Sequence, residues 1–204
     1  MIVIGLTGPS GSGKSTVSAL FSARGLPVID ADAVYRELLT PPSDCLDELV
    51  LNFGRGILNV DGTLDRRTLG KLVFSDREAL ARLNAVAHRH IMEEIRRRIA
   101  ALRKSGTPAV LLDAPQLFEA DAARDCDVVV SVLADEAIRL SRIMRRDGIA
   151  EQDALLRMKA QYSDAFFREH SDYVLENNGD TTALVSAVDA ILHELKIISS
   201  ENKK

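Results

Sequence analysis

The sequence predicts an α/β fold built on a mainly parallel five-stranded sheet, and three observations carry this prediction. Five short apolar runs are separated by stretches with helical periodicity. The runs are continuous rather than alternating, which is typical of strands buried on both faces. A glycine-rich loop directly follows the first run and opens a helix. The expected strands are Ile2–Leu6, Pro27–Ile29, Ala109–Leu112, Asp127–Leu133 and Tyr173–Leu175.

Composition limits the class of protein. The chain has 204 residues, 46% of them hydrophobic, which suffices for one α/β core with an inserted subdomain. The net charge of −4 argues against binding to nucleic acid or to a membrane surface. Cys45 and Cys126 have no metal-ligand spacing and are expected to be reduced thiols. With no charged leader and no apolar run of membrane-spanning length, the sequence predicts a cytoplasmic protein.

The loop from Gly8 to Ser15 matches G-x-x-x-x-G-K-[ST] at every required position. Its backbone N–H groups are expected to surround a nucleotide phosphate, with added positive potential from the helix over Val17–Ala23. An ordinary glycine turn is the weaker interpretation, because strand, loop and helix all agree with the motif. Lys14 would reach the β- and γ-phosphates, and the Ser15 hydroxyl would bind Mg²⁺. The expected ATP-binding residues of the loop are Gly11, Ser12, Gly13, Lys14, Ser15 and Thr16.

The segment between the second and third expected strands is far longer than a simple crossover needs. Its helical patterns predict an inserted helical region over 31–105, a natural place for an acceptor substrate. The helices expected inside it are Ala31–Leu39, Asp44–Phe53, Asp65–Phe74 and Asp76–Leu102. Later helices are expected over Glu136–Arg146, Ile149–Tyr162 and Thr181–Ile198, and the tail Ser199–Lys204 is expected to fray.

Acidic residues follow two of the expected strands. Asp30 and Asp32 come after the second strand and, in extended geometry, would point to the same side, where one of them could take a proton from an attacking hydroxyl. Capping of the next helix is the competing interpretation for an isolated Asp here. Asp113 ends the third strand and is expected to hold Mg²⁺ directly or through water.

The helix expected over Glu136–Arg146 is rich in arginine. At 3.6 residues per turn Arg139, Arg142 and Arg146 share a face, and few acidic residues lie at the spacings that would pair with them. These cations therefore favour a lid that closes on transferred phosphate over a solvated basic face. The lid is expected over 135–170.

Taken together, the residues resemble the dephospho-coenzyme A kinase family over nearly the whole chain. The pair V-I-D-A-D and D-G-x-L-D-R is the most specific part of the resemblance. The matching segments are Thr7–Thr16, Val28–Asp32 with Arg36, Phe53-Gly54, Asp61–Arg66, Leu69 with Val73-Phe74, His88, Asp113 with Pro115 and Phe118-Glu119, Arg142, Arg146-Asp147, Gln161, Asp172–Val174 and Asn177–Gly179.

The resemblance implies a P-loop kinase-like three-layer fold over 1–204, with an inserted helical substrate subdomain and a lid. It implies transfer of the ATP γ-phosphate to the ribose 3′-hydroxyl of dephospho-CoA, with Mg²⁺. The catalytic residues it implies are Asp32, as proton acceptor, with Lys14 and Arg142. Arg146 and Asn177 would join the ATP site, Asn177 near the adenine. The acceptor-side residues it implies, besides Asp32, are Arg36, Arg66, His88 and Glu119.

Five positions depart from the family pattern, and none of these departures changes the class of reaction that the resemblance implies. Pro9 stands where glycine is usual, at the start of the loop and away from the phosphate nest. The others are Arg89 for proline, Gln116 for leucine, Arg139 for a lid glutamine and Ser171 for alanine.

Two other hypotheses stay open on the loop alone: another small P-loop kinase acting on a nucleoside or nucleoside monophosphate, and a nucleotide-dependent switch. The sequence does not specify an oligomeric state.

Overall fold

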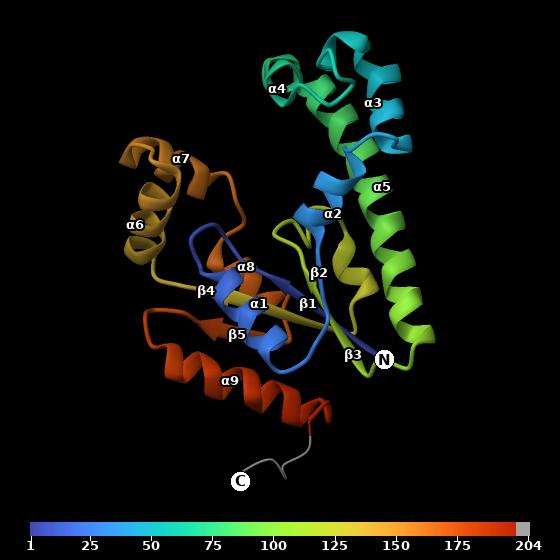
Figure 1. Cartoon of the computed structure of the whole chain (residues 1–204). Coiled ribbons are helices and arrows are strands. Elements are labelled where there is room, and N and C mark those ends of the chain that lie inside the picture. The colour runs from blue at the N-terminus through green and yellow to red at the C-terminus, as the bar shows by residue number, and fades with distance from the viewer. Residues whose placement is uncertain (199–204) are drawn as a thin grey trace. The chain divides into compact units, whose positions relative to one another are not determined.

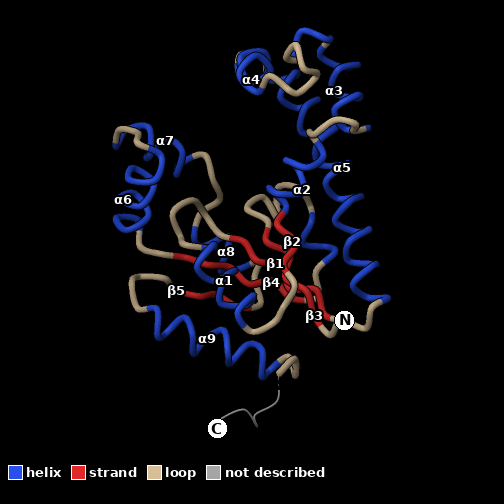
Figure 2. Tube along the Cα trace, viewed as in Figure 1, coloured by secondary structure: helices blue, strands red, loops and turns tan. Residues whose placement is uncertain are grey.

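The structure is a computed structural model that describes residues 1–198. The tail Ser199–Lys204 lies outside the described residues. The model confirms a five-stranded sheet in the order β2-β3-β1-β4-β5 (Figure 2). The strands are β1 (Ile2–Thr7), β2 (Val28–Asp30), β3 (Ala109–Asp113), β4 (Val128–Leu133) and β5 (Tyr173–Glu176).

β1 runs through the middle of the sheet, parallel to β3 on one side and β4 on the other. Leu6 of β1 pairs with Asp113 of β3, so the two strands end at the same level. β4 pairs in parallel with β5. The carboxyl ends of these strands therefore share one edge, and the segments that follow them are brought together there.

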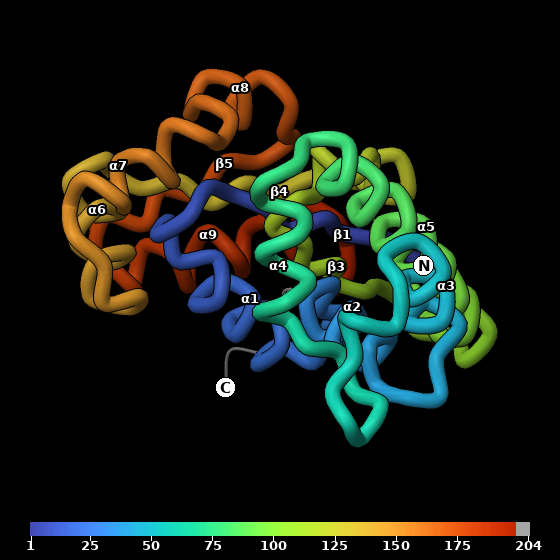
Figure 3. The backbone as a smooth tube through the Cα atoms, turned by 90° about the horizontal axis from the view of Figure 1, so that it is seen from above, coloured from blue at the N-terminus to red at the C-terminus, as the bar shows by residue number. Residues whose placement is uncertain are grey.

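The chain divides into two compact units, each described here by itself. The first contains residues 1–28 and the chain from 102 onward. Its helices α6 and α7 pack against each other (Figures 1 and 3). The helices of this unit are α1 (Lys14–Ala23), α6 (Glu136–Asp147), α7 (Glu151–Lys159), α8 (Asp164–Glu169) and α9 (Thr181–Glu194), with a 3-10 turn at Ala122–Asp125.

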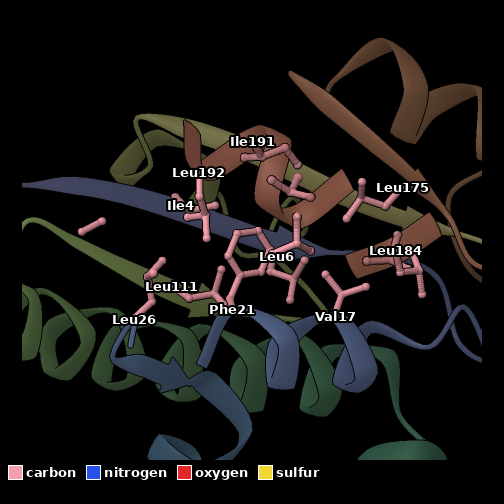
Figure 4. Packing of buried hydrophobic residues seen from close by; sticks show 14 residues of the cluster. Ile4, Leu6, Val17, Phe21, Leu26, Leu111, Leu175, Leu184, Ile191 and Leu192 are labelled. Atoms are coloured by element: carbon pink, nitrogen blue, oxygen red, sulfur yellow. The ribbon is translucent and has the colours of Figure 1, made fainter. Parts of the chain in front are cut away.

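Apolar residues of α1 and α9 form the core of this unit against one face of the sheet (Figure 4). Phe21 of α1 is fully buried among Ile4 and Leu6 of β1 and Leu192 of α9. Burying such a side chain contributes about 2–3 kcal/mol. This packing fixes α1, and therefore the loop that precedes it, against the central strand.

The second unit, residues 29–101, is a group of helices with its own core. Cys45, Leu49, Ile57 and Leu69 lie fully or almost fully buried in it. Side-chain caps start its helices: Ser43 Oγ accepts from the Leu46 N–H, for example, at 3.2 Å. The elements are α2 (Ala31–Leu38), α3 (Asp44–Phe53), a 3-10 turn (Arg55–Ile57), α4 (Arg66–Phe74) and α5 (Arg77–Lys104), whose last turn lies in the first unit.

Two of the helices are shorter than the sequence predicts. The helix expected over Thr181–Ile198 ends at Glu194, because Lys196 has a φ of +56° and a right-handed helix cannot continue through it. The helix expected over Ile149–Tyr162 spans only Glu151–Lys159. Ser163 then caps a separate helix, α8, by accepting from the Phe166 N–H. The expected strands and the remaining helices are confirmed to within a few residues at each end.

Both cysteines are free thiols, as expected. Burial raises the pKa of Cys45 to about 11 and that of Cys126 to about 12. Both are therefore protonated at neutral pH and poorly nucleophilic. This is the behaviour of thiols that serve only to pack the core.

Glu94 on α5 offers a test of stability in the second unit. Its carboxylate accepts from Arg97 Nε at 2.6 Å and Arg98 Nε at 2.7 Å, which lowers its pKa from 4.5 to about 2. A lowered folded-state pKa stabilises the protein above pH 4.5, and this stabilisation is lost as the pH falls towards 2. We expect Glu94→Gln to lower the free energy of unfolding by about 1 kcal/mol at neutral pH and by progressively less below pH 4.5.

Urea unfolding across this pH range measures the difference. Exposed Glu93 beside it is the matched control, and Glu93→Gln should change the free energy by less than about 0.5 kcal/mol. An equal loss in the two variants, or a Glu94→Gln deficit that does not depend on pH, would contradict the assignment.

Candidate active site

The glycine-rich loop leaves the carboxyl end of β1 and enters α1 at Lys14. Two of its glycines are required by close approach as well as by backbone conformation. A Cβ on Gly8 would lie 2.2 Å from the Val132 carbonyl oxygen, and Gly8 has a φ of +148°. A Cβ on Gly13 would lie 1.9 Å from Asn177 Nδ2, and Gly13 has a φ of +89°. Another residue type at Gly8 would force the backbone to move, and at Gly13 it would force the loop or the Asn177 side chain to move.

The loop lysine and the acidic residue at the end of β3 meet at this edge of the sheet. Lys14 Nζ forms an ion pair with Asp113 Oδ1, and both side chains are largely buried. The strand register places Asp113 at this edge, because it pairs with Leu6 near the end of β1. The structure thus brings together the two residues that the sequence assigned to phosphate and to Mg²⁺.

Asn177, directly after β5, also reaches the loop. Its Nδ2 donates to the Ser12 carbonyl at 2.7 Å, and the side chain is buried. The Ser12 hydroxyl itself is buried and has no hydrogen-bond partner within residues 1–198. An orphaned buried hydroxyl beside three loop glycines suits a loop made to hold an external ligand. The contact of Asn177 with adenine stays a prediction.

Three of the four arginines of α6, those predicted to share a face, lie in different surroundings. Arg142 Nη1 donates to the carbonyls of Gly11 at 3.2 Å and Ser12 at 3.3 Å, which places a cation at the loop. Exposed Arg146 instead pairs with its neighbour Asp147 at 2.7 Å. Buried Arg139 pairs with Asp164 at 2.9 Å. The sequence argument considered only partners at helical spacings, and Arg139 and Arg146 have acidic partners at other spacings, Asp164 and Asp147.

Asp30, Asp32 and the residues predicted for the acceptor side lie in the second unit, with one exception. Asp30 ends β2 and caps α2, accepting from the Ala33 N–H at 3.0 Å, so the capping interpretation holds for it. Asp32 lies exposed in the first turn of α2. The argument that both carboxylates point the same way is therefore wrong, because the chain is already helical at Asp32 and the two-residue period of a strand ends at Asp30.

Four further residues predicted for the acceptor side are distributed over several elements. Arg36 on α2 lies 3.9 Å from the Asp30 carboxylate, Arg66 begins α4, and His88 lies half-buried on α5. Glu119 is the exception, because it belongs to the first unit, where it lies exposed after β3. Their contact with an acceptor stays a prediction.

The residues present fit a magnesium ion. Ser15 in the first turn of α1 and Asp113 offer the hard oxygen donors that Mg²⁺ prefers. Within residues 1–198, no three His, Cys, Asp or Glu side chains gather in a group that could hold a metal. Mg²⁺ usually binds through one or two protein oxygens and keeps its other positions for water and phosphate.

Sequence reasoning gave no role to two residues that touch the loop or its neighbours. Gln161 Oε1 accepts from the Ser10 N–H at 2.9 Å, across 151 positions of sequence. Asp164 forms an ion pair with Arg139, whose side chain contacts the loop. The family resemblance marked Gln161 without explaining it, and no local pattern pointed to Asp164.

None of the described helices is both long and apolar enough to cross a membrane.

The chain is similar to known proteins of one family. The family model for dephospho-CoA kinase matches residues 2–183. A dephospho-CoA kinase of Geobacillus kaustophilus is 42% identical over 178 residues, covering 87% of this chain and 89% of that protein. One from Corynebacterium efficiens is 40% identical over 195 residues, covering 96% and 98%.

Solved structures agree on the fold. A Thermus thermophilus protein superposes with a TM-score of 0.79 at 36% identity, covering 95% of this chain and 97% of its own. The dephospho-CoA kinase of Campylobacter jejuni gives a TM-score of 0.71 at 23% identity, covering 95% and 96%, and shows the fold alone. A shikimate kinase of Bacteroides thetaiotaomicron gives 0.54 at 15% identity over 96% and 98%. From the matched family model and these curated relatives, the chain belongs to the dephospho-CoA kinase family.

Proposed function

We propose that this protein transfers the γ-phosphoryl group of ATP to the ribose 3′-hydroxyl of dephospho-CoA, giving CoA and ADP in the last step of coenzyme A synthesis. The observation that carries the proposal is the Lys14–Asp113 pair beneath the glycine loop, in a chain of the dephospho-CoA kinase family. The loop identifies the phosphoryl donor, and family membership identifies the acceptor.

The loop and α6 supply the charge that phosphoryl transfer requires. The N–H groups of 11–16 and the Lys14 ammonium bind the triphosphate, since both present positive charge at the N-terminal end of α1. Arg142, donating to two loop carbonyls, adds a guanidinium to stabilise charge that develops on the transferred group. Arg146 and Asn177 complete the ATP side, and 135–170 acts as a lid over it.

Asp32 is proposed to accept the proton from the acceptor. As the ribose oxygen forms its bond to the γ-phosphorus, its proton passes to the Asp32 carboxylate. The bond between the γ-phosphorus and the β,γ-bridging oxygen breaks, and ADP leaves with that electron pair. An exposed carboxylate in the first turn of α2 suits this role, since it is open to substrate.

The region 31–105 is proposed to bind the rest of dephospho-CoA, with Arg36, Arg66 and His88, and with Glu119 from outside it. The compact unit formed by residues 29–101 supports this boundary. Ser15 and Asp113 would hold Mg²⁺, which neutralises phosphate charge when bound. We propose a cytoplasmic protein that binds neither nucleic acid nor membranes.

An acceptor panel tests the function. With MgATP and coupled detection of ADP, we expect turnover with dephospho-CoA and at least about a hundredfold lower kcat/KM with CMP, uridine, adenosine or shikimate. Phosphorus NMR of the product should show the new monoester on the 3′-oxygen. A preference for a nucleoside or nucleoside monophosphate would overturn the proposal in favour of another small kinase. Nucleotide binding without transfer to any of these acceptors would favour a switch.

A further inference from the structure

The backbone of one loop residue is held from both sides by side chains of the 135–170 segment. Ser10 lies between Pro9 and Gly11. Its N–H donates to Gln161 Oε1 at 2.9 Å, and its carbonyl accepts from Arg139 Nε at 3.1 Å. Gln161 follows α7 and Arg139 belongs to α6, so two separate parts of the segment converge on a single residue.

The arginine in this arrangement is itself fixed. Arg139 is only 5% exposed, and its Nη1 donates to Asp164 at 2.9 Å while its Nε donates to Ser10. The backbone of α6 is also close, because a Cβ on Gly11 would lie 2.6 Å from the Arg139 carbonyl oxygen. A buried guanidinium with two charge-assisted or polar partners has little freedom to move, since losing either leaves a buried charge uncompensated.

Peptide planarity turns these contacts into control of the phosphate-binding N–H groups. The carbonyl of Ser10 and the N–H of Gly11 belong to one planar unit and point in opposite directions. Holding the Ser10 carbonyl therefore sets the direction of the Gly11 N–H. The next units are held in the same way, because Arg142 donates to the carbonyls of Gly11 and Ser12 and Asn177 donates to that of Ser12.

Gln161 holds the preceding peptide unit, the one between Pro9 and Ser10. The N–H of Ser10 shares a planar unit with the carbonyl of Pro9, which in turn accepts from the Ser12 N–H at 3.1 Å. Gln161 thus fixes the start of the loop, and Arg139 fixes the next peptide unit. Neither side chain is assigned a contact with nucleotide by the site described above.

We propose that Arg139, Gln161 and Asp164 are positioning residues that set ATP affinity by holding the peptide units on either side of Ser10. Arg139 and Gln161 hold Ser10 directly, and Asp164 acts through Arg139. The kinetic part of this inference rests on the proposed function, whereas the nucleotide-binding part does not.

The experiment measures the variants Gln161→Leu, Asp164→Ala, Asp164→Asn and Arg139→Met in the full-length protein. Gln161→Leu and Arg139→Met should raise the Kd for MgADP, measured by calorimetry, about tenfold, because a misdirected N–H group forfeits a charge-assisted hydrogen bond to phosphate. Asp164→Ala should raise it less, and Asp164→Asn, which keeps an acceptor for Arg139, should recover most of the affinity. Arg145→Met, at an exposed position of the same helix, is the matched control and should stay within about twofold.

Two further readouts separate positioning from a general loss of stability. The KM for ATP should rise while the KM for dephospho-CoA changes less than about twofold, since only the loop is altered. Hydrogen exchange at the Ser10 amide should become at least about tenfold faster in Gln161→Leu, with exchange in β1 unchanged.

Three results would overturn the inference: a Kd for MgADP within about twofold of the parent in Gln161→Leu, equal effects of Asp164→Ala and Asp164→Asn, or parallel rises in both KM values. If Arg139→Met fails to fold, Gln161→Leu and the two Asp164 variants still decide the question. If dephospho-CoA is not the acceptor, the calorimetric and exchange results remain valid, so failure of the proposed function is recognised separately.

Discussion

Replacing Gly13 with alanine should abolish ATP binding. Gly13 has a φ of +89°, and an added Cβ would lie 1.9 Å from Asn177 Nδ2. The left-handed backbone alone costs a non-glycine residue about 1–2 kcal/mol, and the overlap forces the loop or Asn177 to move. Since Gly13 starts α1 next to Lys14, this movement misdirects the N–H groups that meet phosphate. We expect kcat/KM for ATP to fall at least about a hundredfold, and calorimetry to show no MgATP binding in the millimolar range.

Gly25 supplies the matched control. Its φ of +85° is nearly the same, but no atom lies within 4 Å of its hypothetical Cβ, and it lies after α1 rather than before it. Gly25→Ala should therefore lower the free energy of unfolding by about 1–2 kcal/mol and leave ATP affinity unchanged. Retention of ATP binding by Gly13→Ala would show that the loop accommodates a Cβ, and that the contact with Asn177 is not a constraint.

Replacing Asp32 with asparagine should lower kcat by about 10²–10⁴-fold, the range that general-base catalysis supplies, and leave the Kd for MgATP unchanged. Asparagine keeps the size of the side chain but cannot take a proton at neutral pH. The measurement is single-turnover transfer to dephospho-CoA, paired with calorimetry of MgATP binding.

Asp30 is the natural control for Asp32. It accepts from the Ala33 N–H as the cap of α2, and asparagine caps a helix about as well as aspartate. Asp30→Asn should therefore keep most of the activity. If Asp30→Asn loses transfer while Asp32→Asn retains it, the proton acceptor is Asp30 and the assignment made here is wrong.

The fold could be predicted because its elements depend on local patterns. Continuous apolar runs identified the strands, and the long stretch between the second and third strands identified the helical insertion. Boundaries failed where a single backbone angle decided them, as at Lys196. Helix α8 was missed because its six residues are too few to show a helical period, and its start depends on a serine cap.

The site was predictable where its residues follow strands and unpredictable where they meet through space. Lys14 was found from the loop motif and Asp113 because it directly follows a buried strand, and the two meet because parallel strands end at a common edge. Gln161 and Asp164 could not be given roles, since their partners Ser10 and Arg139 lie 151 and 25 positions away. The Asp30–Asp32 argument failed because the two-residue period of a strand was extended to Asp32, two residues past the end of β2 and already inside α2.

The contacts of the glycine loop also set an order of events during synthesis. The ribosome makes Gly8–Ser15 before the two strands that flank β1, which begin at Ala109 and Val128. The side chains that donate to the loop carbonyls, Arg139, Arg142 and Asn177, come later still. The nucleotide site therefore stays incomplete until Asn177 has left the exit tunnel. A truncated chain ending before 177 would carry the entire phosphate-binding motif and lack one of the side chains that give it shape.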